Sequence, residues 1–285
     1  MKKQIVQFIR SAENLETITG NAVTLAKTLD LEVKLLMVLE TRYPYFYPMT
    51  STLKTGLETY EFERIHEERR KEEEKVLKKF ADRKNAETAH PRVSFEIFSG
   101  ATDMVLIDVS EQPETFLILI TQAHEPEQGF IINTYLNTLE KTRCPVLKIP
   151  VDFNFGEVSK ILYATDYNKE DVDTLLRLVE IARPFDAEIT TLHITDSLDM
   201  EEKLKRHGFE SSIQEKIGYE PVSFAVQADK DVVHGIMEYA RKGHFDLIVL
   251  LKENRNFLQR LFTRSDSNKI LAEADVPVMI CHEKN

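Results

Sequence analysis

The chain has 285 residues, a length that suggests about two domains, and with 42% hydrophobic and 30% charged residues it is too apolar for a disordered protein. Its net charge of −11 disfavours general binding to nucleic acid or to anionic membrane surfaces. No apolar run approaches the roughly 18 residues of a membrane span, and the two cysteines, Cys144 and Cys281, exclude a disulfide scaffold and a thiolate zinc site.

The first half of the chain begins with apolar segments at residues 4–9 and 32–38. Residues 43–48, Tyr-Pro-Tyr-Phe-Tyr-Pro, form an aromatic segment whose prolines exclude a helix interior. Residues 57–84 predict one long charged helix, and its expected apolar contacts are Leu57, Tyr60, Ile65, Val76, Leu77 and Phe80. The polar stretch within it is explained by a solvated face with i,i+4 ion pairs. A partner-binding or dimerising helix is the alternative.

The second half alternates between strand and helix patterns. Residues 160–164 predict a strand that ends at a polar turn, and apolar positions from Val172 to Ala182 then recur at helical spacing. Strands are expected at 188–194 and 222–226, followed by a helix that buries Ile236 and Ala240. Residues 247–251 are apolar throughout, as in a central strand, and a last helix near 267–274 leads into a strand at 277–281.

The two halves share short matching segments in the same order. Residues 26–38 match 182–194 at an offset of 156, and Ile5 matches Ile161 at the same offset. The further matches pair 93–95 with 222–224, 116–120 with 247–251, and 144–147 with 276–279. We therefore expect two domains, at 1–150 and 157–285, with an insertion at about 41–85 in the first.

Alternating strands and helices predict an α/β fold with right-handed crossovers and helices on both faces of a parallel sheet. Each copy is expected to be a five-stranded unit of three layers. Ligands of such sheets bind beyond the carboxyl ends of the strands.

These features resemble the universal stress protein family in its tandem two-domain form. The resemblance rests on Lys-Ile-Leu-Tyr-Ala-Thr-Asp at 160–166, on the apolar strand before a charged loop, and on the closing Pro-Val strands at 145–146 and 277–278. It implies an adenine-nucleotide alpha-hydrolase-like fold and a cytoplasmic stress-response role exercised by binding. It also implies an internal pseudo-dimer, in which residues 146–149 and 278–281 lie side by side.

Many members of that family bind ATP through a loop with the pattern Gly, two residues, Gly, nine residues, Gly, then Ser or Thr, because glycines let the backbone approach phosphates. In copy two the glycine positions hold Leu251, Asn254 and Arg264, whereas the family's Ser and first-strand Asp remain as Ser265 and Asp166. We expect Leu251 and Arg264 to place side chains where phosphates need open backbone. Tight ATP or AMP binding is therefore not expected.

Copy one departs further from the family pattern. Ile120, Ala123 and Asn133 fall on its glycine positions, Thr134 on the Ser/Thr position, and Arg10 on the first-strand aspartate position. We interpret this copy as degenerate for ATP.

Other chemistries find no support in the sequence. The chain has no Walker loop, no G-x-S-x-G elbow and no G-x-G-x-x-G after a strand. No pair of its eight histidines has ligand spacing together with a carboxylate, so we expect no metal site, and His193 is expected to be structural. Both cysteines are expected to be small buried residues. We predict that the protein is not an enzyme.

Two functions remain open. The first is a non-catalytic adaptor whose unknown protein partner binds residues 43–84, with a homodimer also open. The second is a nucleotide sensor with an altered site in copy two, where Asp166, Asn254 and Ser265 would bind the nucleotide and Arg255 or Arg264 would bond its phosphate.

Overall fold

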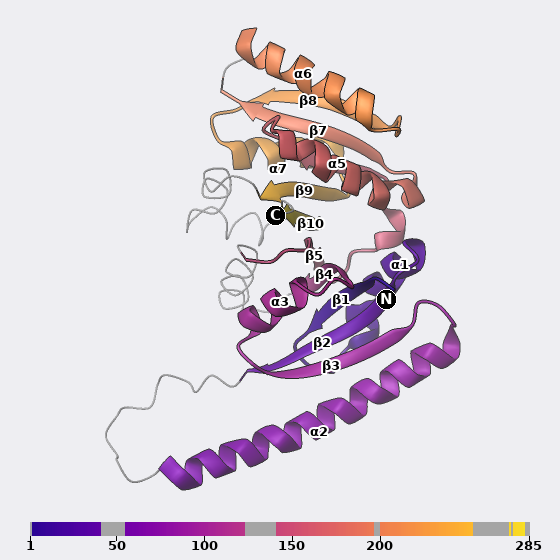
Figure 1. Cartoon of the computed structure of the whole chain (residues 1–285), viewed down its shortest axis with the longest axis vertical. Helices are drawn as coiled ribbons and strands as arrows, with labels where there is room; N and C mark the ends of the chain where they lie inside the picture. The colour runs from indigo at the N-terminus through magenta and orange to yellow at the C-terminus, as the bar shows by residue number, and fades with distance from the viewer. Residues whose placement is uncertain are drawn as a thin grey trace.

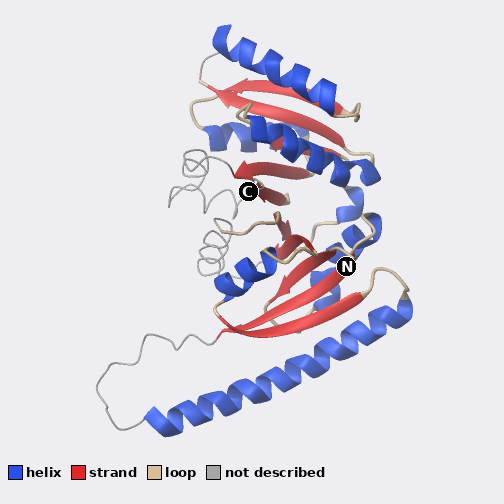
Figure 2. Cartoon of the chain, viewed as in Figure 1, coloured by secondary structure: helices blue, strands red, loops and turns tan. Residues whose placement is uncertain are grey.

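A computed structural model describes residues 2–40, 55–122, 141–196, 200–252, 274 and 276–282. The chain forms one continuous sheet with helices on both faces (Figures 1 and 2). The predicted helix at 267–273 and the aromatic segment at 43–48 lie outside the described residues.

Each half of the chain supplies five strands. In unit one the elements are β1 (Gln4–Ile9), α1 (Leu15–Thr28), β2 (Glu32–Glu40), α2 (Thr55–Glu87), β3 (Val93–Gly100), α3 (Thr102–Ser110), β4 (Thr115–Gln122) and β5 (Val146–Pro150). In unit two they are η1 (Phe155–Glu157), β6 (Lys160–Ala164), α5 (Lys169–Ala182), η2 (Arg183–Phe185), β7 (Glu188–Thr195), α6 (Met200–Lys216), β8 (Val222–Ala228), α7 (Val232–Gly243), β9 (Leu247–Lys252) and β10 (Val278–His282).

The ten strands have the order β3-β2-β1-β4-β5-β10-β9-β6-β7-β8. All neighbours within each unit are parallel, and the two units join through the antiparallel pair β5–β10, in which Leu147 lies opposite Met279. The predicted α/β fold with two tandem five-stranded units is confirmed, as is the side-by-side placement of residues 146–149 and 278–281. This pairing protects two strands that would otherwise be exposed sheet edges.

Strand register tests the internal repeat residue by residue. Ile5 lies opposite Leu117, and its counterpart Ile161 lies opposite Leu247, so Leu117 and Leu247 are equivalent. The predicted match of 116–120 with 247–251 is therefore wrong by one residue. Because a one-residue slip exchanges the two faces of a strand, the copy-one counterpart of Leu251 is Thr121 and not Ile120. Uniformly apolar strands carry no alternation that could have fixed this register.

The sheet separates two apolar cores. One core lies on the face covered by α1, α2, α5 and α6, and includes Leu25, Leu77, Leu175 and Phe209. The other lies on the face covered by α3 and α7, and includes Leu106 and Ile236. Both cores extend through the residues of β5 and β10, so the two units share their interior.

Helix α2 is longer and less buried than its counterpart in unit two. It connects the second and third strands of unit one, as α6 does in unit two, although no element was predicted for the region of α6. In α2, Leu77, Phe80 and Ala81 are buried, but Ile65 and Val76 are 59% and 45% exposed. The prediction that Ile65 and Val76 make core contacts is wrong. The first turns of α2 extend beyond the sheet (Figure 1), and Val76 is exposed although the adjacent Leu77 is buried.

The unequal burial of α2 leads to a stability prediction. We expect Leu77→Ala to lower the free energy of unfolding by about 2–3 kcal/mol, because it opens a cavity in the core. Ile65→Ala, on the exposed half, should change it by less than about 0.5 kcal/mol. Urea denaturation followed by circular dichroism measures both, and equal effects would contradict the assignment of α2 to two environments.

No helix among the described residues has the length and apolar character needed to cross a membrane.

Candidate functional site

The candidate site lies at the carboxyl end of β6, where the strand order reverses. From β6 the chain continues to β7 on one side, whereas β9 is the neighbour on the other side. Such reversal points are where open α/β sheets bind ligands. Asp166 follows β6 at this edge, and its side chain is 39% exposed. The other predicted ligands, Asn254, Arg264 and Ser265, lie outside the described residues.

The loop that carries Asp166 is organised by a buried carboxylate. Asp171, 2% exposed, accepts hydrogen bonds from the hydroxyls of Tyr163 and Thr165 (2.8 Å for Thr165) and from the backbone N–H of Asn168 (2.8 Å). The Asn168 side chain accepts in return from the backbone N–H of Asp171, so α5 begins with a complete capping box. Burial raises the pKa of Asp171, and burial together with the adjacent Asp171 carboxylate raises the pKa of Tyr163 well above its usual value.

Tyr167 turns the chain sharply beside Asp166. Its φ of 61° lies in the left-handed region, which is unfavourable for a residue with a side chain. Its backbone N–H donates to the Thr165 hydroxyl at 2.9 Å. The Tyr167 ring stacks on His193 with 4.4 Å between centroids and contacts Phe209 of α6 at 5.2 Å. These contacts fix the position of the Tyr167 and His193 rings near Asp166.

His193 is a site residue that the sequence analysis interpreted as structural only. It lies in the buried part of β7, and its Nδ1 lies 2.8 Å from the Thr165 carbonyl oxygen and 3.9 Å from an oxygen of Asp166. The hydrogen bond to Thr165 bears out the expected structural role, and the position adds proximity to Asp166. The available signal was its place near the carboxyl end of the strand that pairs with β6.

Carboxylates already occupy helix starts at this edge of the sheet. Glu40 accepts from the backbone N–H of Thr102 at the start of α3 (3.0 Å), and Asp231 accepts from the N–H groups of Val233 and His234 in α7. Asp171 plays this part in α5. A carboxylate at each of these helix starts takes up backbone N–H groups that could bind phosphate and adds a negative charge, which disfavours phosphate there.

Unit one has a different arrangement at the equivalent place. Arg10 stands where Asp166 stands in unit two, and the backbone N–H of Ala12 donates to the Glu73 carboxylate of α2 at 3.0 Å. A side chain from the long helix therefore reaches the loop after β1. An additional negative charge at this position disfavours an anionic ligand.

The interpretation of Leu251 needs correction. Its side chain is 5% exposed and belongs to the core on the α5 and α6 face. Leu251 therefore packs in the core against the sheet and does not fill the space where phosphates would lie. This substitution alone does not block phosphate binding. Arg264, the other residue expected to block phosphate, lies outside the described residues.

The two cysteines are chemically quiet. Cys144 and Cys281 are both about 6% exposed, and burial raises the pKa of each thiol to about 12. Thiols with such values carry almost no thiolate at neutral pH. The prediction that they are small buried residues is confirmed.

The comparison with protein families gives a match to the second unit of the chain. Residues 157–282 match the family model described as the universal stress protein family. Unit two is therefore a universal stress protein domain. Unit one repeats the strand order of that matched domain in the structure. Comparison with curated protein sequences gives no significant match.

Solved structures share the fold of this chain over nearly its whole length. A universal stress protein from Archaeoglobus fulgidus DSM 4304 is 16% identical, with a TM-score of 0.69 and 98% of each chain covered. A Pseudomonas aeruginosa UCBPP-PA14 protein described as a universal stress protein is 14% identical, with a TM-score of 0.55 over 99% of this chain and 94% of that one. The cytoplasmic domain of a prokaryotic cation chloride cotransporter is 9% identical, with a TM-score of 0.52 over 98% and 95%. At these identities the likeness concerns the fold.

Proposed function

We propose that this protein is a non-catalytic regulator that acts by binding a protein partner, and that the partner contacts the exposed half of α2. The observation that carries the proposal is the exposure of residues 63–72, of which only His66 is partly buried, on a helix whose following turns belong to the core. A stress-response role and a cytoplasmic place of action are part of the same proposal.

The exposed half of α2 continues into a half that packs against the rest of unit one. Lys84 contacts Glu16 of α1 at 2.7 Å, which raises the pKa of Lys84, and Arg83 contacts the same carboxylate. Leu77 and Phe80 anchor the helix to the core below these contacts. A pre-organised helix loses little conformational entropy on binding, which favours association.

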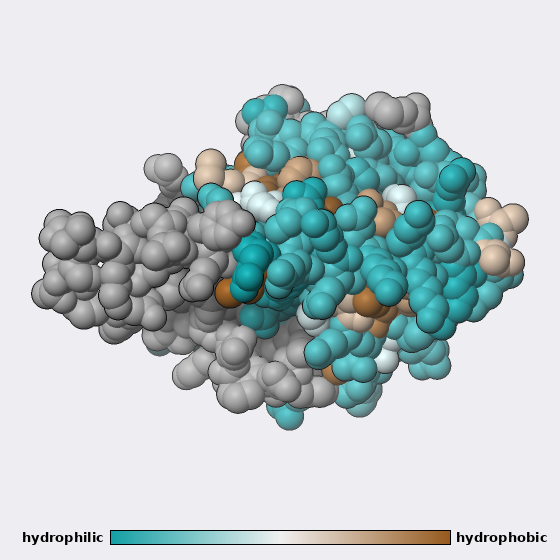
Figure 3. Space-filling model, turned by 90° about the horizontal axis from the view of Figure 1, so that it is seen from below, coloured by the Kyte–Doolittle hydropathy of each residue, from teal (hydrophilic) through white to brown (hydrophobic). Residues whose placement is uncertain are grey.

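The chemistry of this surface favours a polar, charged partner. Exposed ion pairs of the i,i+4 type join Arg64 to Glu68 and Lys71 to Glu67. Ile65 contributes one exposed apolar side chain among them. The face of the molecule seen from the α2 side is mainly hydrophilic, with scattered hydrophobic spots (Figure 3). Charged surfaces of this kind contribute to the rate and specificity of association.

The experiment is site-specific photo-crosslinking in living cells. Because Leu77, Phe80 and Ala81 are core residues, deletion of 43–84 would damage unit one and is not a clean test. A photoreactive amino acid at Glu68 or Glu72 should capture the same discrete protein, and one at His207, exposed on α6, should not. Identical products from all three positions, or none from α2, would contradict the proposal.

The alternative function is nucleotide sensing by unit two. It is favoured by the exposed Asp166 carboxylate beside His193 and the Tyr167 ring, at the place where α/β sheets bind ligands. A carboxylate can accept hydrogen bonds from ribose hydroxyls. Phosphate would then depend on Arg264 and Ser265.

Calorimetric titration with ATP and magnesium, and with AMP, tests this alternative. A sensor would bind with micromolar affinity, about −8 kcal/mol, and Asp166→Ala should weaken binding at least about tenfold. Asp173→Ala, an exposed aspartate on α5, is the matched control and should bind as the parent does. No heat with either nucleotide, or an unchanged affinity in Asp166→Ala, would remove this edge from consideration.

A further inference from the structure

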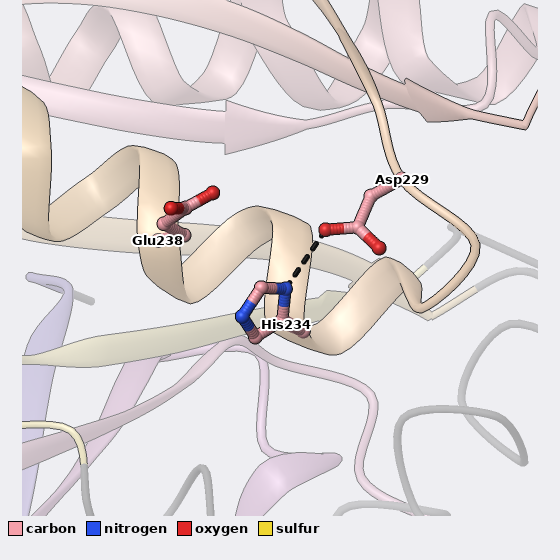
Figure 4. A group of neighbouring side chains, drawn as sticks. All are labelled: Asp229, His234 and Glu238. Atoms are coloured by element: carbon pink, nitrogen blue, oxygen red, sulfur yellow. Dashed lines mark hydrogen bonds and ion pairs between the residues drawn. The ribbon is translucent and has the colours of Figure 1, made fainter.

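Three potential metal ligands converge at the junction of β8 and α7. Asp229 lies in the loop after β8, and His234 and Glu238 lie on successive turns of α7 (Figure 4). One ligand atom from each residue can be chosen so that all lie within 4.8 Å of one another. Within the described part of the chain, no other group of three or more such residues meets this criterion.

The sequence carries a signal that the search for histidine pairs missed. His234 and Glu238 are four residues apart on one helix, so their side chains lie on the same face. The third ligand comes from the preceding loop, which returns the chain to the same face. One histidine with two nearby carboxylates is the sequence pattern that indicates this group.

Both carboxylates are held in place by the surrounding protein. Asp229 accepts from the backbone N–H of Asp231 at 2.9 Å, and its own backbone N–H donates to the Thr195 carbonyl oxygen of β7 at 3.0 Å. Glu238 accepts from Gln227 at 3.3 Å and pairs with Lys242 at 2.7 Å. The Asp229 and Glu238 side chains are 19% and 28% exposed, so they are partly sheltered.

The imidazole is the most exposed member of the group. Its side chain is 66% exposed, and its Nδ1 lies 2.8 Å from the Asp229 carboxylate. The group therefore offers two carboxylates and one imidazole to a cation.

We propose that Asp229, His234 and Glu238 bind one divalent transition-metal ion of the zinc class. Zinc accepts imidazole nitrogen and carboxylate oxygen at about 2.0–2.2 Å, which places neighbouring ligand atoms of a tetrahedron roughly 3.3 Å apart. The ligand atoms lie within 4.8 Å of one another, so metal binding would require side-chain rotation of His234 and Glu238, with Glu238 leaving its contact with Lys242. Magnesium and calcium prefer all-oxygen sites, so the imidazole selects against them. Three protein ligands leave the fourth position to water.

The site has a structural consequence within unit two. A bound ion would replace the Asp229–His234 hydrogen bond by two metal bonds and would tie the β8–α7 loop to the second turn of the helix. Since Asp229 is bonded to the last residue of β7, the ion would stiffen the same sheet edge that carries His193.

The test is calorimetric titration of the whole chain with zinc chloride, in a reducing buffer without chelating components. The parent should bind one equivalent with a Kd of about 10 μM, and His234→Ala should weaken binding at least about tenfold. Glu238→Gln, which keeps the shape of the side chain, should weaken it in the same direction. His207→Ala on α6 is the matched control and should bind like the parent.

Circular dichroism establishes that each variant retains its fold before titration. Binding unchanged in both His234→Ala and Glu238→Gln would overturn the proposal, as would an absence of binding by the parent at millimolar zinc. An equal loss in His207→Ala would also overturn it, because zinc would then bind surface histidines without selection. A titration with magnesium or calcium should show no comparable binding.

Discussion

Replacing Lys148 by methionine is expected to raise the free energy of unfolding at pH 7 by about 3 kcal/mol. Lys148 lies in β5, opposite Val278 of β10, and is 6% exposed. Its amino group has no hydrogen-bond partner among the residues that the structure describes. A buried cation without a partner destabilises the folded state. Methionine has a similar unbranched shape and no charge, so it should retain the packing.

The pH dependence of this effect follows from the pKa of the lysine. Burial lowers that pKa from 10.5 to about 8. Between these values the unfolded chain binds more protons than the folded one, so the stability of the parent rises with pH across this window. Below about pH 8 the lysine is charged in both states and the full cost is present. Lowering the pKa from 10.5 to about 8 corresponds to about 3 kcal/mol.

Urea denaturation at pH 7 and pH 10 measures the difference between variant and parent. The stabilisation should be largest at pH 7 and should shrink strongly by pH 10, where the parent lysine is mostly neutral in the folded state. Lys27→Met, at an exposed position of α1, is the control and should change stability by less than about 0.5 kcal/mol at either pH. A stabilisation that does not depend on pH would mean that packing, and not charge, causes it.

Much of this architecture could be predicted from the sequence because the two halves of the chain share matching segments. Ile5 and Ile161, residues 93–95 and 222–224, and Val146 and Val278 occupy equivalent strand positions in the structure as predicted. The two-unit organisation depends on these matches, whereas the β5–β10 pairing was expected from the family resemblance. The strand match that failed is the one with no polar residue to fix its register.

Helix boundaries and helix environments were harder to predict. The sequence analysis predicts no helix or strand for residues 197–220, but α6 forms there. Its buried side chains, such as Phe209 and Ile213, are few among charged residues, so the helical pattern is weak. In α2 the opposite error arose, since Ile65 has the right residue type but lies beyond the sheet edge. Periodicity identifies an apolar face but not whether another element covers it.

At the candidate site, the sequence identified the exposed residue and missed its support. Asp166 was predicted from the family pattern, whereas Asp171, Tyr163 and His193 were not connected with it. Their relation depends on strand pairing that brings β7 beside β6. The capping-box spacing of Asn168 and Asp171 was a local signal for part of this network.

Loss of the Asp171 carboxylate is expected to be the most damaging single change at this edge. Asp171→Ala would leave the Tyr163 and Thr165 hydroxyls and the Asn168 N–H without their acceptor, all of them in or next to the core. Each buried donor left unpaired costs about 1–3 kcal/mol. We expect a total loss of about 3–5 kcal/mol in the free energy of unfolding, measured by urea denaturation.

The matched control for this change lies two residues away on the same helix. Asp173→Ala, at an exposed position, should alter stability by less than about 0.5 kcal/mol. Tyr163→Phe removes one donor together with its need for an acceptor, so adding it to Asp171→Ala should recover part of the loss. Additive effects of these two substitutions would show that the hydroxyl and the carboxylate stabilise the fold independently. Coupled effects would show that the loop presenting Asp166 is organised by this buried network.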